Sequence, residues 1–213
     1  MEILEIQKVD LTSFCYLNKE RYPFLLESVN HNENNRYSIL FAFPGENIVL
    51  KNFSDFDFLK KLQDKSKSTM LDSDLPFNGG WFVYLSYELI GQIESTLASK
   101  LHKSKLPIAY AVQVPTAIIV DHKLDKTFII DQDNNQSRIN SILSDIKLLD
   151  KTPTQRIKGS QSEEVENKFI DGVKSSLDYI VAGDVFQVNL SRKWQYQLTE
   201  TTDSAIIYNA LKK

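Results

Sequence analysis

The chain contains, from residue 182 to residue 192, the stretch Ala-Gly-Asp-Val-Phe-Gln-Val-Asn-Leu-Ser-Arg. The alternation that begins in this stretch continues to residue 198. Its even-numbered positions from 186 onward are apolar or amphipathic except Arg192, and its odd-numbered positions are polar. Because successive side chains of a strand point to opposite faces, the pattern predicts one strand over residues 186–198 with an apolar face and a polar face.

The polar face of this predicted strand has two readings. A solvated outer face of an antiparallel sheet is the common origin of such alternation. However, the first polar positions are Gln187, Asn189 and Ser191, and amide and hydroxyl groups can hold a small polar ligand in a defined orientation without a net charge. Both readings stay open on the pattern alone.

A helix is predicted immediately before the strand. Ser160 and Glu163 have the spacing of a capping box, and Gly183 stands where a left-handed C-terminal cap would be needed. Between them, apolar residues recur at helical spacing and form one face: Val165, Phe169, Val173, Leu177 and Ile180.

The first part of the chain is predicted to be rich in strands. Residues 24–28 and 37–43 are apolar runs separated by an Asn-rich turn and indicate a hairpin. Residues 115–120 and 127–130 indicate a second hairpin. The run 81–87 follows a Gly-Gly pair and is apolar enough to predict a buried strand.

A short helix is predicted over residues 53–62, capped by Ser54 or Asp55. A last amphipathic segment covers residues 203–213 and stops without a cap, so we expect a truncated chain.

The predicted organisation is an α+β lobe over residues 1–150, a linker over 151–161 with the composition of a surface connection, and the start of a second unit over 162–213. The strands come from short hairpins, so the sheets are predicted to be mainly antiparallel, with helices packed outside them.

Composition excludes several classes of protein. The 213 residues are 42% hydrophobic and can bury a substantial core. The chain has 25 Lys and Arg residues and 28 Asp and Glu residues. Its net charge of -3 is not the excess of positive charge that is typical of proteins that bind nucleic acid. No apolar run approaches the roughly 20 residues that a membrane span needs. Cys15 is the single cysteine, and the N-terminus lacks a secretory pattern, so a cytoplasmic protein is expected.

No metal site is predicted within this sequence. The residues from Asp131 to Asn135 start like a calcium loop, but Gln136 occupies the glycine position and Ile142 that of the closing glutamate. The three histidines, at positions 31, 102 and 122, lie far apart in polar turns and are interpreted as solvated loop residues rather than as metal ligands or bases.

Three separated segments carry a family resemblance. They are Tyr-Pro-Phe-Leu-Leu-Glu-Ser at 22–28, Gly-Gly-Trp-Phe-Val-Tyr-Leu-Ser-Tyr-Glu at 79–88, and the stretch 182–192. Together they resemble the large, chorismate-binding subunits of aminodeoxychorismate synthase and anthranilate synthase, in the same order along nearly the whole chain. The resemblance implies two stacked, mainly antiparallel sheets in a sandwich with peripheral helices, of which this chain supplies only part.

The resemblance also implies a function. The Gln-Val-Asn-Leu run at 187–190 is similar to the aminodeoxychorismate branch, which aminates chorismate with ammonia from a glutamine amidotransferase partner for p-aminobenzoate and folate synthesis. Anthranilate synthase, for tryptophan synthesis, is the alternative, and a non-catalytic amino-acid-binding or assembly module is another. The position of Gln187 matches a lysine that activates water in hydroxylating relatives. Gln187 is therefore expected to line the active site, and Asn189 is a second candidate.

A regulatory site and a cofactor are implied in the same way. Leu26, Glu27 and Ser28, joined by Ser38, resemble the family's tryptophan pocket, although Ser28 could simply begin the following turn. The family's Mg²⁺ ligands and most of its chorismate contacts match no position of this sequence, so they are expected in a second half of the native protein. The 213-residue chain alone is expected to be inactive.

Overall fold

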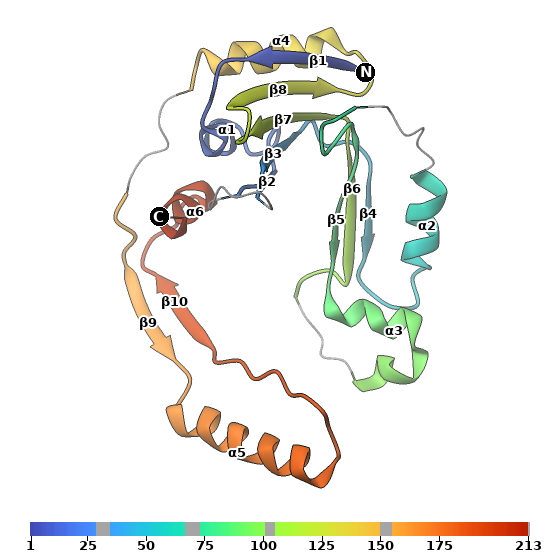
Figure 1. Ribbon diagram of the computed structural model, residues 1–213, viewed down its shortest axis with the longest axis vertical. Coiled ribbons are helices and arrows are strands. Elements are labelled where there is room, and N and C mark those ends of the chain that lie inside the picture. The colour runs from blue at the N-terminus through green and yellow to red at the C-terminus, as the bar shows by residue number, and fades with distance from the viewer. Residues whose placement is uncertain (29–34, 67–72, 101–104, 150–154, 213) are drawn as a thin grey trace. The chain divides into compact units, whose positions relative to one another are not determined.

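The strand β7 (Thr116–Asp121) is the most deeply buried element, with all six residues buried. The structure is a computed structural model, and it describes residues 1–28, 35–66, 73–100, 105–149 and 155–212. The chain divides into two units, Met1–Thr152 (unit 1) and Pro153–Leu211 (unit 2), which are described separately. The ribbon is drawn in Figure 1.

Unit 1 contains two antiparallel sheets. The five-stranded sheet has the order β1-β8-β7-β3-β2, and the three-stranded sheet has the order β4-β6-β5. Their bounds are β1 (Glu2–Ile6), β2 (Phe24–Leu26), β3 (Tyr37–Ala42), β4 (Asn47–Leu50), β5 (Gly80–Leu85), β6 (Ala109–Val114) and β8 (Lys126–Asp131). The hairpins β2–β3 and β7–β8 confirm the two predicted ones.

The helices of unit 1 are short. They are α1 (Leu11–Leu17), α2 (Phe58–Lys65), α3 (Ile90–Ile93) and α4 (Gln136–Ile146), with 3₁₀ turns η1 (Tyr87–Leu89) and η2 (Ser95–Lys100). Apolar residues of α1 and α4 share a core with alternate residues of β3, β7 and β8, so these helices cover one face of the larger sheet. Phe58 of α2 packs with β4 and β6 on the smaller sheet. The mixed α+β class with antiparallel sheets is confirmed.

The two sheets of unit 1 join where β6 runs through Pro115 into β7. An aromatic cluster fills this junction. The rings of Phe24 and Phe82 stack with centroids 4.1 Å apart, and Phe41 meets the Phe82 ring edge-on at 5.3 Å. Such pairs add to the burial of apolar area, so the cluster fixes the two sheets against each other.

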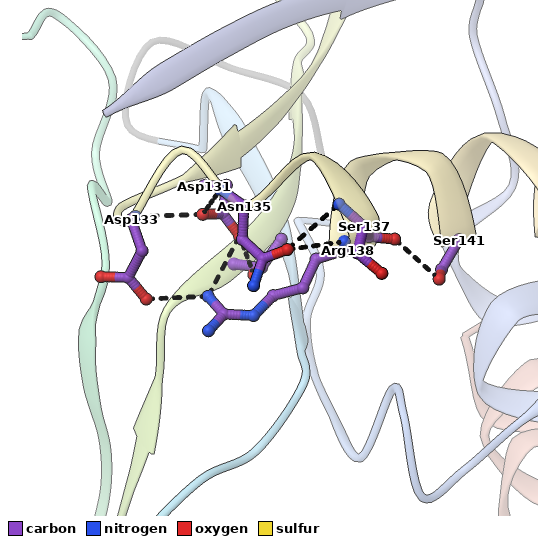
Figure 2. Close-up of polar contacts among 7 residues, drawn as sticks. Asp131, Asp133, Asn135, Ser137, Arg138 and Ser141 are labelled. Carbon is purple, nitrogen blue, oxygen red and sulfur yellow. Dashed lines mark hydrogen bonds and ion pairs between the residues drawn. The ribbon is translucent and has the colours of Figure 1, made fainter.

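Each end of the β7–β8 hairpin carries a buried carboxylate. At one end Asp131, opposite Thr116, accepts hydrogen bonds from the Thr116 hydroxyl at 2.7 Å and from the backbone nitrogens of Asp133 and Asn135. Figure 2 shows this network, in which Arg138 lies 3.2 Å from Asp131. The Asn135 side chain caps α4, so the network ties the start of the helix to the end of the strand.

At the other end Asp121, 1% exposed, is held by Arg36. The Arg36 Nε atom lies 3.0 Å from Oδ1 and its NH2 atom 2.5 Å from Oδ2, a bidentate pair. Asp121 also accepts from the backbone nitrogens of Lys123 and Leu124. The Arg36 guanidinium lowers the pKa of Asp121 below its ordinary value of 3.8, and the turn amides act in the same direction.

Unit 2 is built from few elements. They are β9 (Gly159–Glu163), α5 (Glu166–Ala182), β10 (Trp194–Leu198) and α6 (Ser204–Leu211). β9 and β10 form a two-stranded antiparallel sheet. Gly183 ends α5 with φ = 80°, in the left-handed conformation that glycine adopts without strain, as predicted.

Several predicted boundaries in unit 2 are wrong. Ser160 and Glu163 do not cap a helix, because both lie in β9, paired with Gln197 and Trp194. The strand β9 therefore also occupies residues 159–161 of the predicted linker. The predicted strand over 186–198 is regular only from Trp194, since β9 offers a ladder to those five residues alone.

Two predictions in unit 1 are also wrong. The helix predicted over 53–62 begins at Phe58 and is capped by Asp57, because Asp55 is used in a turn with Asn52. The run 81–87 is not a buried strand. β5 ends at Leu85 and is an edge strand, and its last residues from Val83 to Leu85 are exposed.

A buried tyrosine links α4 to the segment before β2. The Tyr22 hydroxyl donates to Asp145 Oδ2 at 2.6 Å, and Arg21 contacts the same oxygen at 2.5 Å. Burial, and then the Asp145 carboxylate, raise the pKa of Tyr22 above its ordinary value. The hydroxyl therefore stays protonated and remains a donor over the whole range in which the protein is handled.

We expect Tyr22→Phe to lower the free energy of unfolding by about 1–2 kcal/mol, because a hydrogen bond to a charged, buried acceptor is lost while the ring is kept. Urea unfolding of unit 1 measures the change. Tyr16→Phe, at an exposed position of α1, is the matched control and should have no effect. Equal urea midpoints for Tyr22→Phe and the wild type would contradict the hydrogen bond assigned between Tyr22 and Asp145.

The Asp121–Arg36 pair predicts a pH dependence. The pKa of Asp121 is lower in the folded protein than in the unfolded chain. The carboxylate therefore contributes fully to the free energy of unfolding above the ordinary carboxyl pKa, and this contribution is lost as the pH falls through the folded pKa. Asp121→Asn should lower the free energy of unfolding by about 1–3 kcal/mol at pH 7 and should flatten its decline at acid pH.

The measurement is urea unfolding at a series of pH values from neutral to strongly acidic. Asp64→Asn, which removes a carboxylate from an exposed position of α2, serves as the control and should follow the wild-type curve. A wild-type curve parallel to that of Asp121→Asn at all pH values would refute the assignment.

Candidate functional site

The predicted catalytic residues lie together but not in a strand. Gln187 Nε2 donates to Asn189 Oδ1 at 3.2 Å, and both side chains are exposed in unit 2. They belong to a segment, residues 186–193, that forms no helix or strand. Both are neutral amides, with donors and acceptors but no useful basicity, so they can orient a polar ligand but cannot remove a proton from it.

The end of α5 determines where this segment runs. Backbone bonds from Gly183 to Ile180 and from Asp184 to Tyr179 close the helix. The chain then reverses, and the Leu190 side chain comes to lie beside Gly172, where an added Cβ atom would be 3.8 Å from the Leu190 methyl carbons. That distance is an ordinary van der Waals contact, so the returning segment packs against α5 through Leu190 without requiring a glycine at position 172.

A cavity of about 760 Å³ lies between α5 and this returning segment. Its lining combines apolar and charged residues: Glu164, Lys168, Phe169, Gly172, Leu190, Ser191, Arg192, Lys193 and Trp194. Two of its three cations are paired with glutamates, Lys168 with Glu164 and Arg192 with Glu163, so most of the positive charge of the lining is balanced.

Ion pairs hold the charged side chains of this cavity. Arg192 contacts Glu163 of β9 at 2.9 Å and stands 5.6 Å from the centre of the Trp194 ring. Lys168 pairs with Glu164 one turn earlier and lowers the pKa of that carboxyl group. Sequence reasoning did not single out these residues, although Arg192 had interrupted the apolar alternation and could have marked them.

A second cluster joins β2 to β3 in unit 1. The Ser28 backbone nitrogen donates to Ser38 Oγ at 3.0 Å, and the Ser28 hydroxyl donates to the Tyr37 carbonyl at 2.8 Å. Of the other pocket residues predicted from the sequence, Leu26 is exposed at the end of β2 and Glu27 is half-buried beside Ser28. The structure thus brings Ser28 and Ser38 together, as expected.

His122 completes this cluster and was not predicted. Its Nε2 atom lies 2.8 Å from Ser38 Oγ, and its backbone nitrogen donates to the Arg36 carbonyl. His122 follows Asp121 in the turn after β7, so the Arg36–Asp121 pair positions it. The interpretation of His122 as a solvated loop residue is corrected: it is half-buried and bonded. His31 and His102 lie outside the described residues.

The cluster separates the roles of the two serines. Ser38 is 1% exposed and is already bonded to Ser28 and His122, so it supports the pocket and does not face a ligand. The Ser28 hydroxyl uses its only proton on the Tyr37 carbonyl. Its oxygen therefore keeps acceptor capacity, whereas the Glu27 carboxylate already accepts from the Lys212 ammonium group, with Nζ 3.2 Å from Oε2. An ammonium group is thus the kind of partner that this carboxylate takes.

The part of the chain that the structure describes offers neither a metal centre nor a membrane span. Within these residues, no group of three or more His, Cys, Asp or Glu side chains could hold a metal ion. No helix among them is long and apolar enough to cross a membrane.

Comparison with known proteins gives the following relatives. An anthranilate synthase component I-like protein of Synechocystis sp. is 25% identical over 201 residues, covering 87% of this chain and 40% of the relative. Anthranilate synthase component 1 of Lactococcus lactis is 25% identical over 208 residues, covering 85% and 45%. The chain thus spans less than half the length of these curated relatives.

A solved structure shares the fold. The crystal structure of anthranilate synthase component I from Streptococcus pneumoniae matches with a TM-score of 0.62 and 21% identity, over 86% of this chain and 46% of that chain. The family model described as chorismate binding enzyme matches residues 18–213, which include unit 2, the part of unit 1 after α1, and both clusters. The chain therefore belongs to the chorismate-binding enzyme family.

Proposed function

We propose that this chain belongs to a subunit that converts chorismate to 4-amino-4-deoxychorismate, with ammonia from a glutamine amidotransferase partner, in the cytoplasm. The family match over residues 18–213 is the observation that supports chorismate as the substrate. The Gln-Val-Asn-Leu run at 187–190, similar to the aminodeoxychorismate branch, favours this product.

The chemistry of Gln187 supports amination over hydroxylation. A general base within reach of water would favour attack by hydroxide, whereas an amide leaves water unactivated. Ammonia, which is already a nucleophile when neutral, needs no such base. Gln187, beside Asn189 at 3.2 Å, would orient the substrate.

Anthranilate synthesis is the second candidate. The relatives from Synechocystis sp. and Lactococcus lactis favour it, since the first is an anthranilate synthase component I-like protein and the second is anthranilate synthase component 1. Both reactions add nitrogen to chorismate, so the identity of the released product separates the two.

The Mg²⁺ expected of this family finds no group of ligands among the described residues. We propose that its ligands match the part of the longer relatives that this chain does not cover, and we derive no step through the ion. For the same reason the 213-residue chain by itself is proposed to be inactive.

The Ser28 cluster is proposed to bind the α-ammonium group of tryptophan. The Ser28 oxygen supplies an acceptor at the end of β2, and Leu26 supplies an exposed apolar contact. Glu27 supplies a carboxylate that pairs with the Lys212 ammonium group at 3.2 Å, a group that the α-ammonium group of the ligand would replace. If the chain were a non-catalytic module, this amino-acid site would be its function.

The identity of the reaction product tests the proposed amination. The native gene product, supplied with chorismate, Mg²⁺ and ammonium, should form aminodeoxychorismate, identified by chromatography and mass spectrometry. Gln187→Lys should divert part of the turnover to a hydroxylated product, because it introduces a base beside the substrate. Gln195→Lys, on the polar side of β10, is the control and should not. Release of anthranilate by the wild type would favour the second candidate instead.

The binding of tryptophan tests the proposed amino-acid site. Calorimetric titration of the 213-residue chain should detect binding, and Glu27→Gln should weaken it at least about tenfold, because a charge-assisted hydrogen bond is lost. Glu20→Gln, which removes an exposed carboxylate before β2, should leave the affinity unchanged. Equal affinities for the wild type and Glu27→Gln would rule out the assigned role of Glu27.

A further inference from the structure

A lysine side chain binds the acceptors next to Ser28. The Lys212 Nζ atom donates to Thr12 Oγ1 at 2.7 Å, and it lies 3.2 Å from Oε2 and 3.3 Å from Oε1 of Glu27. The Asp10 carboxylate lies 3.9 Å from the same nitrogen. By its contacts Lys212 belongs to unit 1, as do its three partners. A primary ammonium group is thus surrounded by oxygen atoms of three residues.

Most of these groups are withdrawn from water. The Lys212 and Glu27 side chains are 19% and 18% exposed, and Thr12 is 1% exposed. Thr12 and Asp10 are fixed to each other, because the Thr12 backbone nitrogen donates to Asp10 Oδ1 at 3.1 Å. A carboxylate with so little access to water is costly without a cationic partner. Glu27 therefore requires an ammonium group, whichever molecule supplies it.

The charges and the geometry of this site select a primary ammonium group. Asp10 and Glu27 supply two carboxylates, whereas Lys212 supplies one positive charge, so the site keeps an excess of negative charge. An ammonium group has three N–H donors on one nitrogen, and three acceptor residues lie around that nitrogen. A guanidinium group spreads its donors over a plane and does not match this arrangement.

From this geometry we infer that Lys212 is an internal competitor of the amino-acid ligand. Its ammonium group fills the position that the ligand's α-ammonium group takes, so the ligand binds only after Lys212 has left. The inference adds Thr12 and Asp10 to the residues that hold the ligand. It rests on the proposed amino-acid site at Glu27 and Ser28 and specifies how that site is regulated. The apparent affinity is lowered according to the fraction of molecules in which Lys212 fills the site.

Calorimetric titration of the 213-residue chain tests the competition. The probes are tryptophan and tryptamine, which keeps the ammonium group and the ring but has no carboxylate. Both should bind Lys212→Met at least about tenfold more tightly than the wild type, because the substitution keeps most of the apolar stem and removes the competing charge. Lys60→Met, at an exposed position of α2, is the matched control and should leave both affinities unchanged.

A double substitution separates competition from a structural effect. Glu27→Gln removes a charge that holds both ammonium groups, so in the wild-type background the release of Lys212 partly offsets the loss of ligand affinity. In the Lys212→Met background nothing offsets it, and Glu27→Gln should weaken tryptamine binding by a larger factor. Equal factors in the two backgrounds would show that the two residues do not compete with the ligand for one site, contrary to the inference.

The occupied site can also be observed in the wild type. In a proton–nitrogen correlation spectrum of lysine ammonium groups, Lys212 should give a resolved signal, because its donors are bonded and shielded from water. The absence of this signal in Lys212→Met assigns it. Saturation with tryptamine should abolish the signal. Binding of tryptamine with the signal unchanged would overturn the inference, even if the substitutions perturb the fold.

The results distinguish this inference from the proposed tryptophan function. If Lys212→Met binds tryptamine more tightly than the wild type but does not bind tryptophan, the ammonium site and its competitor stand and the tryptophan function fails. If the wild type and Lys212→Met bind tryptophan equally well, the tryptophan function stands and the internal competitor is refuted.

Discussion

Unit 1 depends on the complete burial of β7. Because no residue of this strand reaches solvent, its backbone groups must be paired by β3 on one side and β8 on the other. The same burial places a carboxylate at each end of the hairpin, and an unpaired one would be costly. Arg36 satisfies Asp121 and Arg138 contributes to Asp131, so the ion pairs are consequences of the buried strand.

The ion pair between Asp121 and Arg36 also positions the cluster of Ser28, Ser38 and His122. By fixing the turn after β7 to the start of β3, it brings His122 against Ser38, and Ser38 in turn holds the backbone of Ser28. The chemistry offered to a ligand at the end of β2 is thus set by residues about 90 positions later in the chain. A change at Asp121 is expected to disturb this cluster without touching it.

In unit 2, features that depend on local sequence were predicted correctly, whereas features that depend on strand pairing were not. The periodicity of α5 correctly predicted a helix with an apolar face and a glycine end, because these are local properties of the chain. The strand predicted from residue 186 formed only from Trp194, because a strand exists only where a neighbour completes its ladder. Likewise Ser160 and Glu163 have the spacing of a capping box, but both pair with residues of β10 and therefore belong to β9.

The sequence by itself determined the antiparallel hairpins, the class of the fold and the glycine end of α5, since short spacings and turns encode these features. The resemblance of three segments indicated the family and grouped Ser28 with Ser38. Only the tertiary structure decided that β5 is an exposed edge, that Asp57 caps α2, and that His122 is part of a cluster. These features depend on which segments meet across long separations, and the burial of β7 and the pairing at its ends choose that arrangement.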